Sequence, residues 1–123
     1  MLQTQEIVFN RGEDGQLLAQ EVVLELLPNK PTVRVRPLTR GRLQEIFAQS
    51  QGDGEAKLQA DNQVIKNGLV EPKLTEQDLE NLMPSYAGAI STAILAVSLG
   101  LNQTEITEKA TEVLQQEQEV KKN

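Results

Sequence analysis

Cysteine, histidine and tryptophan are absent from the 123-residue chain, and phenylalanine and tyrosine together occur three times. The missing cysteine and histidine exclude disulfides, thiol nucleophiles, imidazole bases and the commonest transition-metal ligands. We therefore expect no enzymatic activity, no cofactor and no metal site. Because aromatic residues are so scarce, the core has to be built from Leu, Ile, Val and Ala, and the length fits a single domain.

Charge is distributed unevenly along the chain, whose net charge is −6. The segment between Glu25 and Glu45 contains no acid and carries five basic residues, Lys30, Arg34, Arg36, Arg40 and Arg42. The overall acidity disfavours a nucleic-acid partner, since phosphate binding requires a net basic surface. The local basic patch is better explained as a solvated face or as a contact for an acidic protein. A nucleic-acid-binding regulator stays as the weaker alternative.

Long runs of strongly hydrophobic residues are also lacking. The longest uncharged stretch, Asn81 to Thr104, contains serine, threonine, glycine and alanine, and no basic cluster flanks it closely. This composition favours a buried central helix over a membrane span. The N-terminal residues carry neither the basic nor the apolar region of a secretory signal. We therefore expect a cytoplasmic protein with no membrane partner.

The N-terminal part of the sequence predicts three short strands. Residues 5–9 and 17–27 are rich in Val, Ile and Leu, and turn residues separate them. The segment from Thr32 to Arg36 alternates between apolar and charged residues, which is typical of a strand with one buried face. Together these segments predict an antiparallel three-stranded meander.

Helical patterns begin after Pro37. Thr39 and Thr75 each stand at an N-cap position, and Asp78 completes a capping box with Thr75. A helix is also expected from Glu55 to about Asn67, where Gly68 would take a left-handed conformation and end it. Pro84 should break the next apolar pattern and stand in the first turn of a longer helix.

The pattern as a whole predicts an α+β fold, in which an N-terminal β-meander is followed by a bundle of about four to five helices. We expect one domain over residues 1–102, with strands at about 5–37 and helices at about 39–101. Residues 103–123 are rich in Gln and Glu, and they predict a marginal helix or a disordered tail. The apolar stripe of that segment is Ile106, Ala110, Val113 and Leu114.

The uncharged stretch carries the candidate contact surface. Its apolar residues fall at helical spacing, and we expect Ile90, Ile94, Val97 and Leu101 to engage a partner protein. A strip of small residues runs beside them, at Ala89, Ala93, Ala96 and Gly100. Two interpretations of these strips stay open: other helices of the same domain pack on both, or one of them meets another subunit or a partner.

Two stretches resemble one known family. Residues 33–41 (VRVRPLTRG) are similar to the strand-to-helix connection of the small tail assembly chaperones of long-tailed phages and prophages. Residues 64–75 (VIKNGLVEPKLT), followed by Asp78-Leu79 and by an Ala-rich helix ending at Ser98–Leu101, are similar to the second half of that family. The resemblance covers roughly Thr32 to Leu101.

The resemblance implies a helper that is absent from the finished virion. It would bind the tape-measure protein, keep it soluble, and help to recruit tail-tube subunits in the host cytoplasm. The residues expected to contact partners are those of the apolar stripe and of the basic patch, including Arg34, Arg36, Arg40 and Arg42. Contact between copies of the chain, as a homo-oligomer, is left open. The main alternative is a structural tail component that assembles through the same surfaces.

Overall fold

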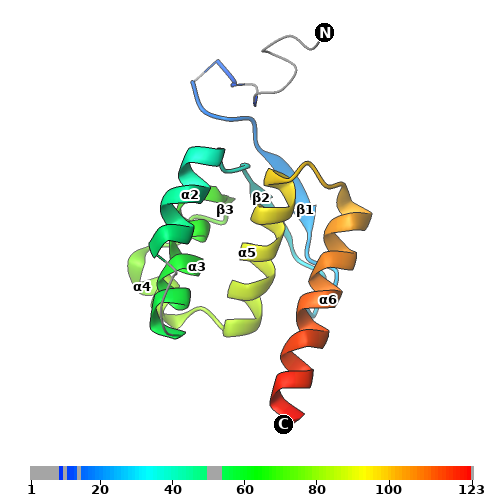
Figure 1. Cartoon of the computed structure of the whole chain (residues 1–123). Coiled ribbons are helices and arrows are strands. Elements are labelled where there is room, and N and C mark those ends of the chain that lie inside the picture. The colour runs from blue at the N-terminus through cyan, green and yellow to red at the C-terminus, as the bar shows by residue number, and fades with distance from the viewer. Residues whose placement is uncertain (1–8, 10, 14, 50–53, 123) are drawn as a thin grey trace, which may run out of the picture.

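The computed structural model describes residues 9, 11–13, 15–49 and 54–122, with side chains at all of them except 49, 54–59 and 113–122. The described residues form three strands and five helices: β1 (Gln20–Val23), β2 (Thr32–Val35), α2 (Arg40–Gln49), α3 (Gly54–Gly68), β3 (Leu69–Glu71), α4 (Glu76–Asn81), α5 (Pro84–Ser98) and α6 (Gln103–Lys122). The predicted α+β fold class is confirmed (Figure 1).

The strands form one antiparallel sheet in the order β1-β2-β3. Val22 pairs with Val33, and Glu21 pairs with Arg34. The two valines are buried, whereas Glu21 and Arg34 are exposed, because successive side chains of a strand point to opposite faces. The alternation that predicted β2 is therefore confirmed, and the buried face of this strand contacts α5.

The third strand of the sheet is not one that the sequence predicts. The predicted strand at 5–9 lies outside the described residues, apart from Phe9, which belongs to no strand. The third described strand is β3, which pairs with β2 on the side away from β1, and in it Glu71 pairs with Arg34. A strand of three residues is too short to show an alternating pattern, so pairing with β2 is what defines it.

The entrances to α2 and α4 follow the predicted caps. The hydroxyl oxygen of Thr39 accepts a hydrogen bond from the backbone N–H of Arg42 (3.2 Å). Thr75 and Asp78 form the capping box, with bonds of 2.9 and 3.1 Å between side chain and backbone. Hydrogen bonds to Thr75 hold the pKa of Asp78 below the ordinary 3.8. The backbone N–H of Thr75 has the largest effect, and its side chain has the next largest.

Gly68 ends α3, but its backbone does not adopt the predicted left-handed conformation, which among the described glycines occurs at Gly15 and Gly100. A Cβ added at Gly68 would lie 2.4 Å from Cγ2 of Ile94, whose side chain is fully buried. The absent side chain therefore allows α3 to approach α5 closely. Glycine is needed at position 68 for close packing. The sequence pattern predicted a different reason, a left-handed backbone conformation, which is wrong.

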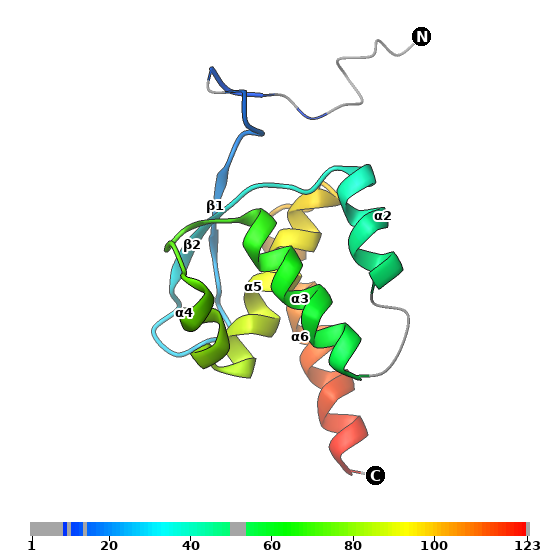
Figure 2. The ribbon, with the colours of Figure 1, turned by 90° about the vertical axis from the view of Figure 1, so that its left-hand side faces the viewer.

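Helix α5 is the centre of the molecule and contacts α3, α6 and β2 (Figures 1 and 2). It begins with Pro84 in its first turn, as predicted. Its buried Ser91 donates a hydrogen bond to Asp61 of α3 (3.2 Å). The hydroxyl of Ser98 accepts from the backbone N–H of Leu38 (2.7 Å), which ties α5 to the segment before α2. No helix in the described part of the chain is long and apolar enough to cross a bilayer.

Gly100 connects α5 to α6. Its φ of 81° and the bonds from Leu101 N–H to Ala96 O and from Gly100 N–H to Val97 O (both 3.0 Å) form a Schellman motif. Helix α6 then turns back along α5, and its C-terminal end extends beyond the other helices (Figures 1 and 2). Ile106 of α6 is buried in the main core. The core therefore extends past residue 102, where the sequence predicts the domain to end.

Candidate protein-binding groove

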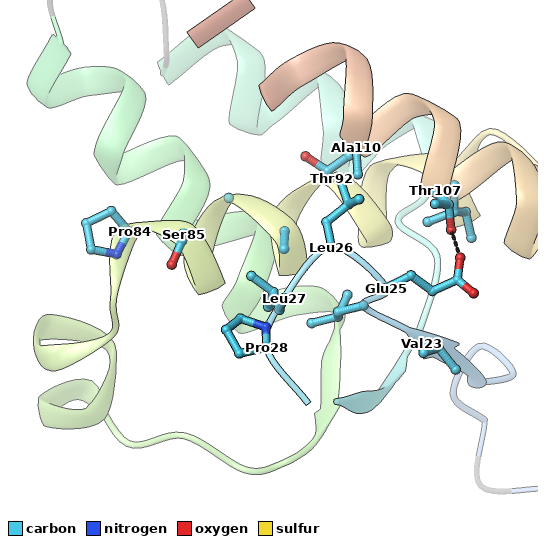
Figure 3. Close-up of a pocket in the computed structure, with 14 residues that line it drawn as sticks. Val23, Glu25, Leu26, Leu27, Pro28, Pro84, Ser85, Thr92, Thr107 and Ala110 are labelled. Atoms are coloured by element: carbon cyan, nitrogen blue, oxygen red, sulfur yellow. Dashed lines mark hydrogen bonds between the residues drawn. The ribbon is translucent and has the colours of Figure 1, made fainter. Parts of the chain in front are cut away.

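An apolar hollow of about 260 Å³ opens between three elements (Figure 3). One side is the turn that follows β1, at 24–28, and the other side is the first half of α6. The floor is the N-terminal half of α5. We call this hollow the groove, and it is an open feature of the described surface that could receive part of another molecule.

Small side chains form the floor of the groove. Ser85, Gly88, Ala89 and Thr92 lie at spacings of three and four residues, which places them on one face of α5. A Cβ added at Gly88 would have no neighbouring atom within 4 Å. The space above this glycine is therefore empty, and the groove is deep because its floor residues are small.

The turn after β1 supplies the first wall. Leu24 and Leu27 are buried, whereas Leu26 stands at the rim with 43% of its surface exposed. A hydrogen bond from Leu27 N–H to Leu24 O (3.1 Å) closes this turn. Pro28 completes the lining of this wall. The wall thus combines two buried core leucines with one exposed leucine, Leu26, which a bound molecule can contact.

Helix α6 supplies the opposite wall through Ile106, Thr107 and Ala110. Its position depends on Gln103, whose side-chain amide forms two hydrogen bonds with the backbone of Val23. The N–H of Val23 donates to Oε1 (3.0 Å), and Nε2 donates to the Val23 carbonyl (2.9 Å). Gln103 therefore occupies the edge of β1 in the way that a neighbouring strand would, and it fixes α6 to the sheet.

Among the residues whose side chains the structure describes, Glu25 is the one charged residue that lines the groove. Its carboxylate accepts a hydrogen bond from the hydroxyl of Thr107, which links the two walls (Figure 3). Among the described residues, no group of three or more His, Cys, Asp or Glu could hold a metal ion. The groove therefore offers a nonpolar surface with a single negative charge at its side. Such a surface suits an apolar side chain that has a positive charge nearby.

The apolar residues that the sequence predicts as a contact surface lie elsewhere. Ile90, Ile94 and Val97 are buried in the core, between 0 and 5% exposed. Leu101 is partly buried and packs against the same core. These four side chains hold α5 against its neighbours, so a partner cannot reach the first three in this conformation. Of the small-residue strip, Ala93 and Ala96 are also buried, whereas Ala89 lines the groove.

The predicted basic patch is partly engaged within the molecule. Nε of Arg36 donates to the carbonyl of Leu17 (2.9 Å), and Arg42 forms an ion pair with Glu45 (3.0 Å). Arg34 stands between the acidic strand partners Glu21 and Glu71. Arg34, Arg40 and Arg42 are exposed. The acids beside Arg34 and Arg42 reduce the attraction that these arginines can exert on an anionic partner.

Sequence reasoning therefore identified the central helix but selected its buried face. The signal for the groove was present in three places: the small residues of α5, the apolar turn at Leu26 and Leu27, and the stripe that begins at Ile106. Of that stripe, Ala110 also lines the groove, whereas the side chains of Val113 and Leu114 lie outside the described ones. Comparisons with protein-family models, with curated proteins and with solved structures give no match to this chain.

Proposed function

We propose that this chain is a tail assembly chaperone of a long-tailed phage or prophage. It binds the tape-measure protein in the host cytoplasm, keeps it soluble during assembly, and helps to recruit tail-tube subunits. The sequence resemblance at residues 33–41 and 64–75 supports this proposal. These segments contain β2, the end of α3 and β3, so they belong to the framework that supports α5.

The observation that carries the proposal is the open groove between α5 and α6. A tape-measure protein is long and helical, and its apolar faces associate before the tail tube surrounds them. A helper has to cover such faces reversibly, which requires an apolar groove of limited size with charge beside it. The groove has these properties: a volume of about 260 Å³, small and aliphatic lining residues, and the carboxylate of Glu25.

Co-expression tests the proposed function. The tape-measure protein of the same phage is produced alone and together with this chain, and its soluble fraction is measured in both cases. The proposal predicts that the chain raises the soluble fraction and co-purifies with the tape-measure protein. An equal soluble fraction with and without the chain would refute it.

Purified phage particles separate the helper from a structural tail component. A chaperone is absent from finished particles, whereas a structural subunit stays in them. Mass spectrometry of purified virions therefore decides between the two, with the tail-tube protein as the positive control. Detection of this chain at the stoichiometry of a tail subunit would favour the structural component.

A further inference from the structure

The glycine at position 88 is not explained by the fold. Glycine weakens the interior of a helix relative to alanine, so it is usually kept for a backbone or packing reason. Gly68 has such a reason in its contact with Ile94. Gly88 lies in the N-terminal half of α5, has no positive φ, and has open space where a Cβ would be. Its lack of a side chain instead deepens the groove.

We propose that Gly88 determines the specificity of the groove, by seating one large apolar side chain of a helical partner segment. An engineered cavity of about 150 Å³ holds a benzene ring, so the 260 Å³ of the groove has room for roughly two large side chains. The empty volume above Gly88 takes the first. The exposed part of Leu26 and the side chain of Ala110 contact the second.

The occupant is a helix because the strand edge beside the groove is already occupied. An extended peptide gains its affinity from backbone hydrogen bonds to a free strand edge. At the groove, both backbone groups of Val23 are bound by Gln103. A bound segment therefore has to satisfy its own backbone, and a helix does this while it presents apolar anchors to the groove.

Charge gives the second element of recognition. Glu25 is the charged residue in the described lining of the groove, and the chain has a net charge of −6. The hydrogen bond from Thr107 fixes the Glu25 carboxylate at the side of the groove. A lysine or arginine one helical turn from the apolar anchor complements this carboxylate. This inference rests on the proposed function for the identity of the partner, but the groove can be tested without the tape-measure protein.

The test uses short amphipathic peptides stapled into a helix, with the full chain as receptor. One peptide carries a phenylalanine anchor and a lysine one turn away. A second replaces phenylalanine with alanine, and a third replaces lysine with glutamate. Binding is followed by fluorescence anisotropy and by the amide resonances of Gly88, Ala89 and Thr92. The receptor variants are Gly88→Ala, Gly88→Leu and Glu25→Gln.

Gly41 provides the matched control. It also lies in a helix, and an added Cβ there would also have no neighbour within 4 Å, but it does not line the groove. Gly41→Ala therefore changes a helical glycine that also has open space at its Cβ position, away from the site. Thermal unfolding of each variant verifies that it is folded. Gly88→Ala adds a smaller side chain to the floor of the groove than Gly88→Leu does.

The inference predicts that the phenylalanine–lysine peptide binds to the wild-type chain and to Gly41→Ala alike. Gly88→Leu should weaken binding by about tenfold or more, the scale of one lost apolar anchor, with a smaller loss for Gly88→Ala. The alanine and glutamate peptides should bind more weakly. Equal binding to Gly88→Leu, or equal binding of the alanine peptide, would overturn the inference. A concentration-dependent dimer that Gly88→Leu abolishes would also overturn it, because the occupant would then be a second copy.

The outcomes separate this inference from the proposed function. If peptide binding depends on Gly88 but the chain does not raise the solubility of the tape-measure protein, the proposed function is refuted and the inference about the groove stands. Solubilisation of the tape-measure protein that does not depend on Gly88 keeps the function and refutes the inference.

Discussion

At the scale of single residues, two helical glycines show how one residue type can serve opposite needs. Gly68 is required by the fold, since a Cβ there would lie 2.4 Å from Ile94. A Cβ added at Gly88 would meet no neighbour within 4 Å, so the fold does not require a glycine there. The first glycine lets two helices approach, and the second leaves room for a partner. Substitution by alanine should therefore change stability in opposite directions.

We predict that Gly68→Ala lowers the free energy of unfolding by about 1–3 kcal/mol, the usual cost of forcing extra atoms into a packed core. Gly88→Ala should raise it by about 0.5–1 kcal/mol, because alanine favours the helix and meets no obstacle. Urea denaturation of both variants measures the two changes, with Gly41→Ala as a reference. A loss of stability in Gly88→Ala would show that the fold does need this glycine.

Asp78 gives a prediction about pH. Its folded pKa is lowered from 3.8 by hydrogen bonds to Thr75. A lowered folded pKa means that the carboxylate stabilises the fold above its unfolded pKa, and that this contribution is lost as the pH falls through the folded pKa. The stability difference between wild type and Asp78→Ala should therefore be present at neutral pH and shrink as the pH falls below 3.8. Chemical denaturation at several pH values measures it, and a difference that persists in strong acid would contradict the assignment.

At the scale of elements, α6 is attached to the sheet chiefly at its first turn. Gln103 bonds both backbone groups of Val23, and Ile106 packs in the core. Without Gln103, the N–H and the carbonyl of Val23 would lose these hydrogen-bond partners. The resulting loss of stability is the free-energy cost of leaving these two groups unpaired. Helix α6 is also a wall of the groove, so its attachment controls the width of the site.

Gln103→Ala should lower the free energy of unfolding by roughly 1–3 kcal/mol, the cost of leaving part-buried polar groups unpaired. It should also speed hydrogen exchange at the amide of Val23, which NMR measures directly. The neighbouring exposed residue gives the control, Thr104→Ala, for which little change is expected. Unchanged protection of Val23 in Gln103→Ala would show that α6 is held by packing alone.

Several elements could be predicted from the sequence because their signals are local. Thr39, and Thr75 with Asp78, mark helix starts through hydrogen bonds to residues within a few positions, so spacing is sufficient. Pro84 marks the start of α5 through its own fixed φ and its missing N–H, which are also local properties. The strand β3 could not be predicted, because its pairing partner β2 lies more than thirty positions earlier in the chain. The role of Gly68 depends in the same way on Ile94, a residue of another helix.

The contact surface predicted from the sequence and the groove both lie on α5, but they lie on different faces of it. Ile90, Ile94 and Val97 form a regular apolar stripe, and such a stripe on a central helix is buried by its neighbours. The groove lies over Ser85, Gly88, Ala89 and Thr92, which are small and only partly apolar. Small side chains form the floor of this site, and small side chains give no apolar pattern in the sequence. The site can therefore be recognised only when α5, α6 and the turn after β1 are placed together in space.

At the scale of the whole molecule, an aliphatic core fixes α5 between α3 and α6, and the remaining face of α5 borders the groove (Figure 1). The body is closely packed where larger residues cover α5, and it is hollow where the residues of α5 are small. A helper needs this combination, because the framework must stay folded whether the groove is empty or occupied. The central claim is that the groove binds the tape-measure protein.

The most direct measurement is the soluble fraction of the tape-measure protein when it is co-expressed with three forms of this chain: wild type, Gly41→Ala and Gly88→Leu. The account predicts that wild type and Gly41→Ala keep the tape-measure protein soluble to the same extent. It predicts that Gly88→Leu, although folded, gives a clearly lower soluble fraction, because this variant binds more weakly. Full solubility with a folded Gly88→Leu chain would contradict the account.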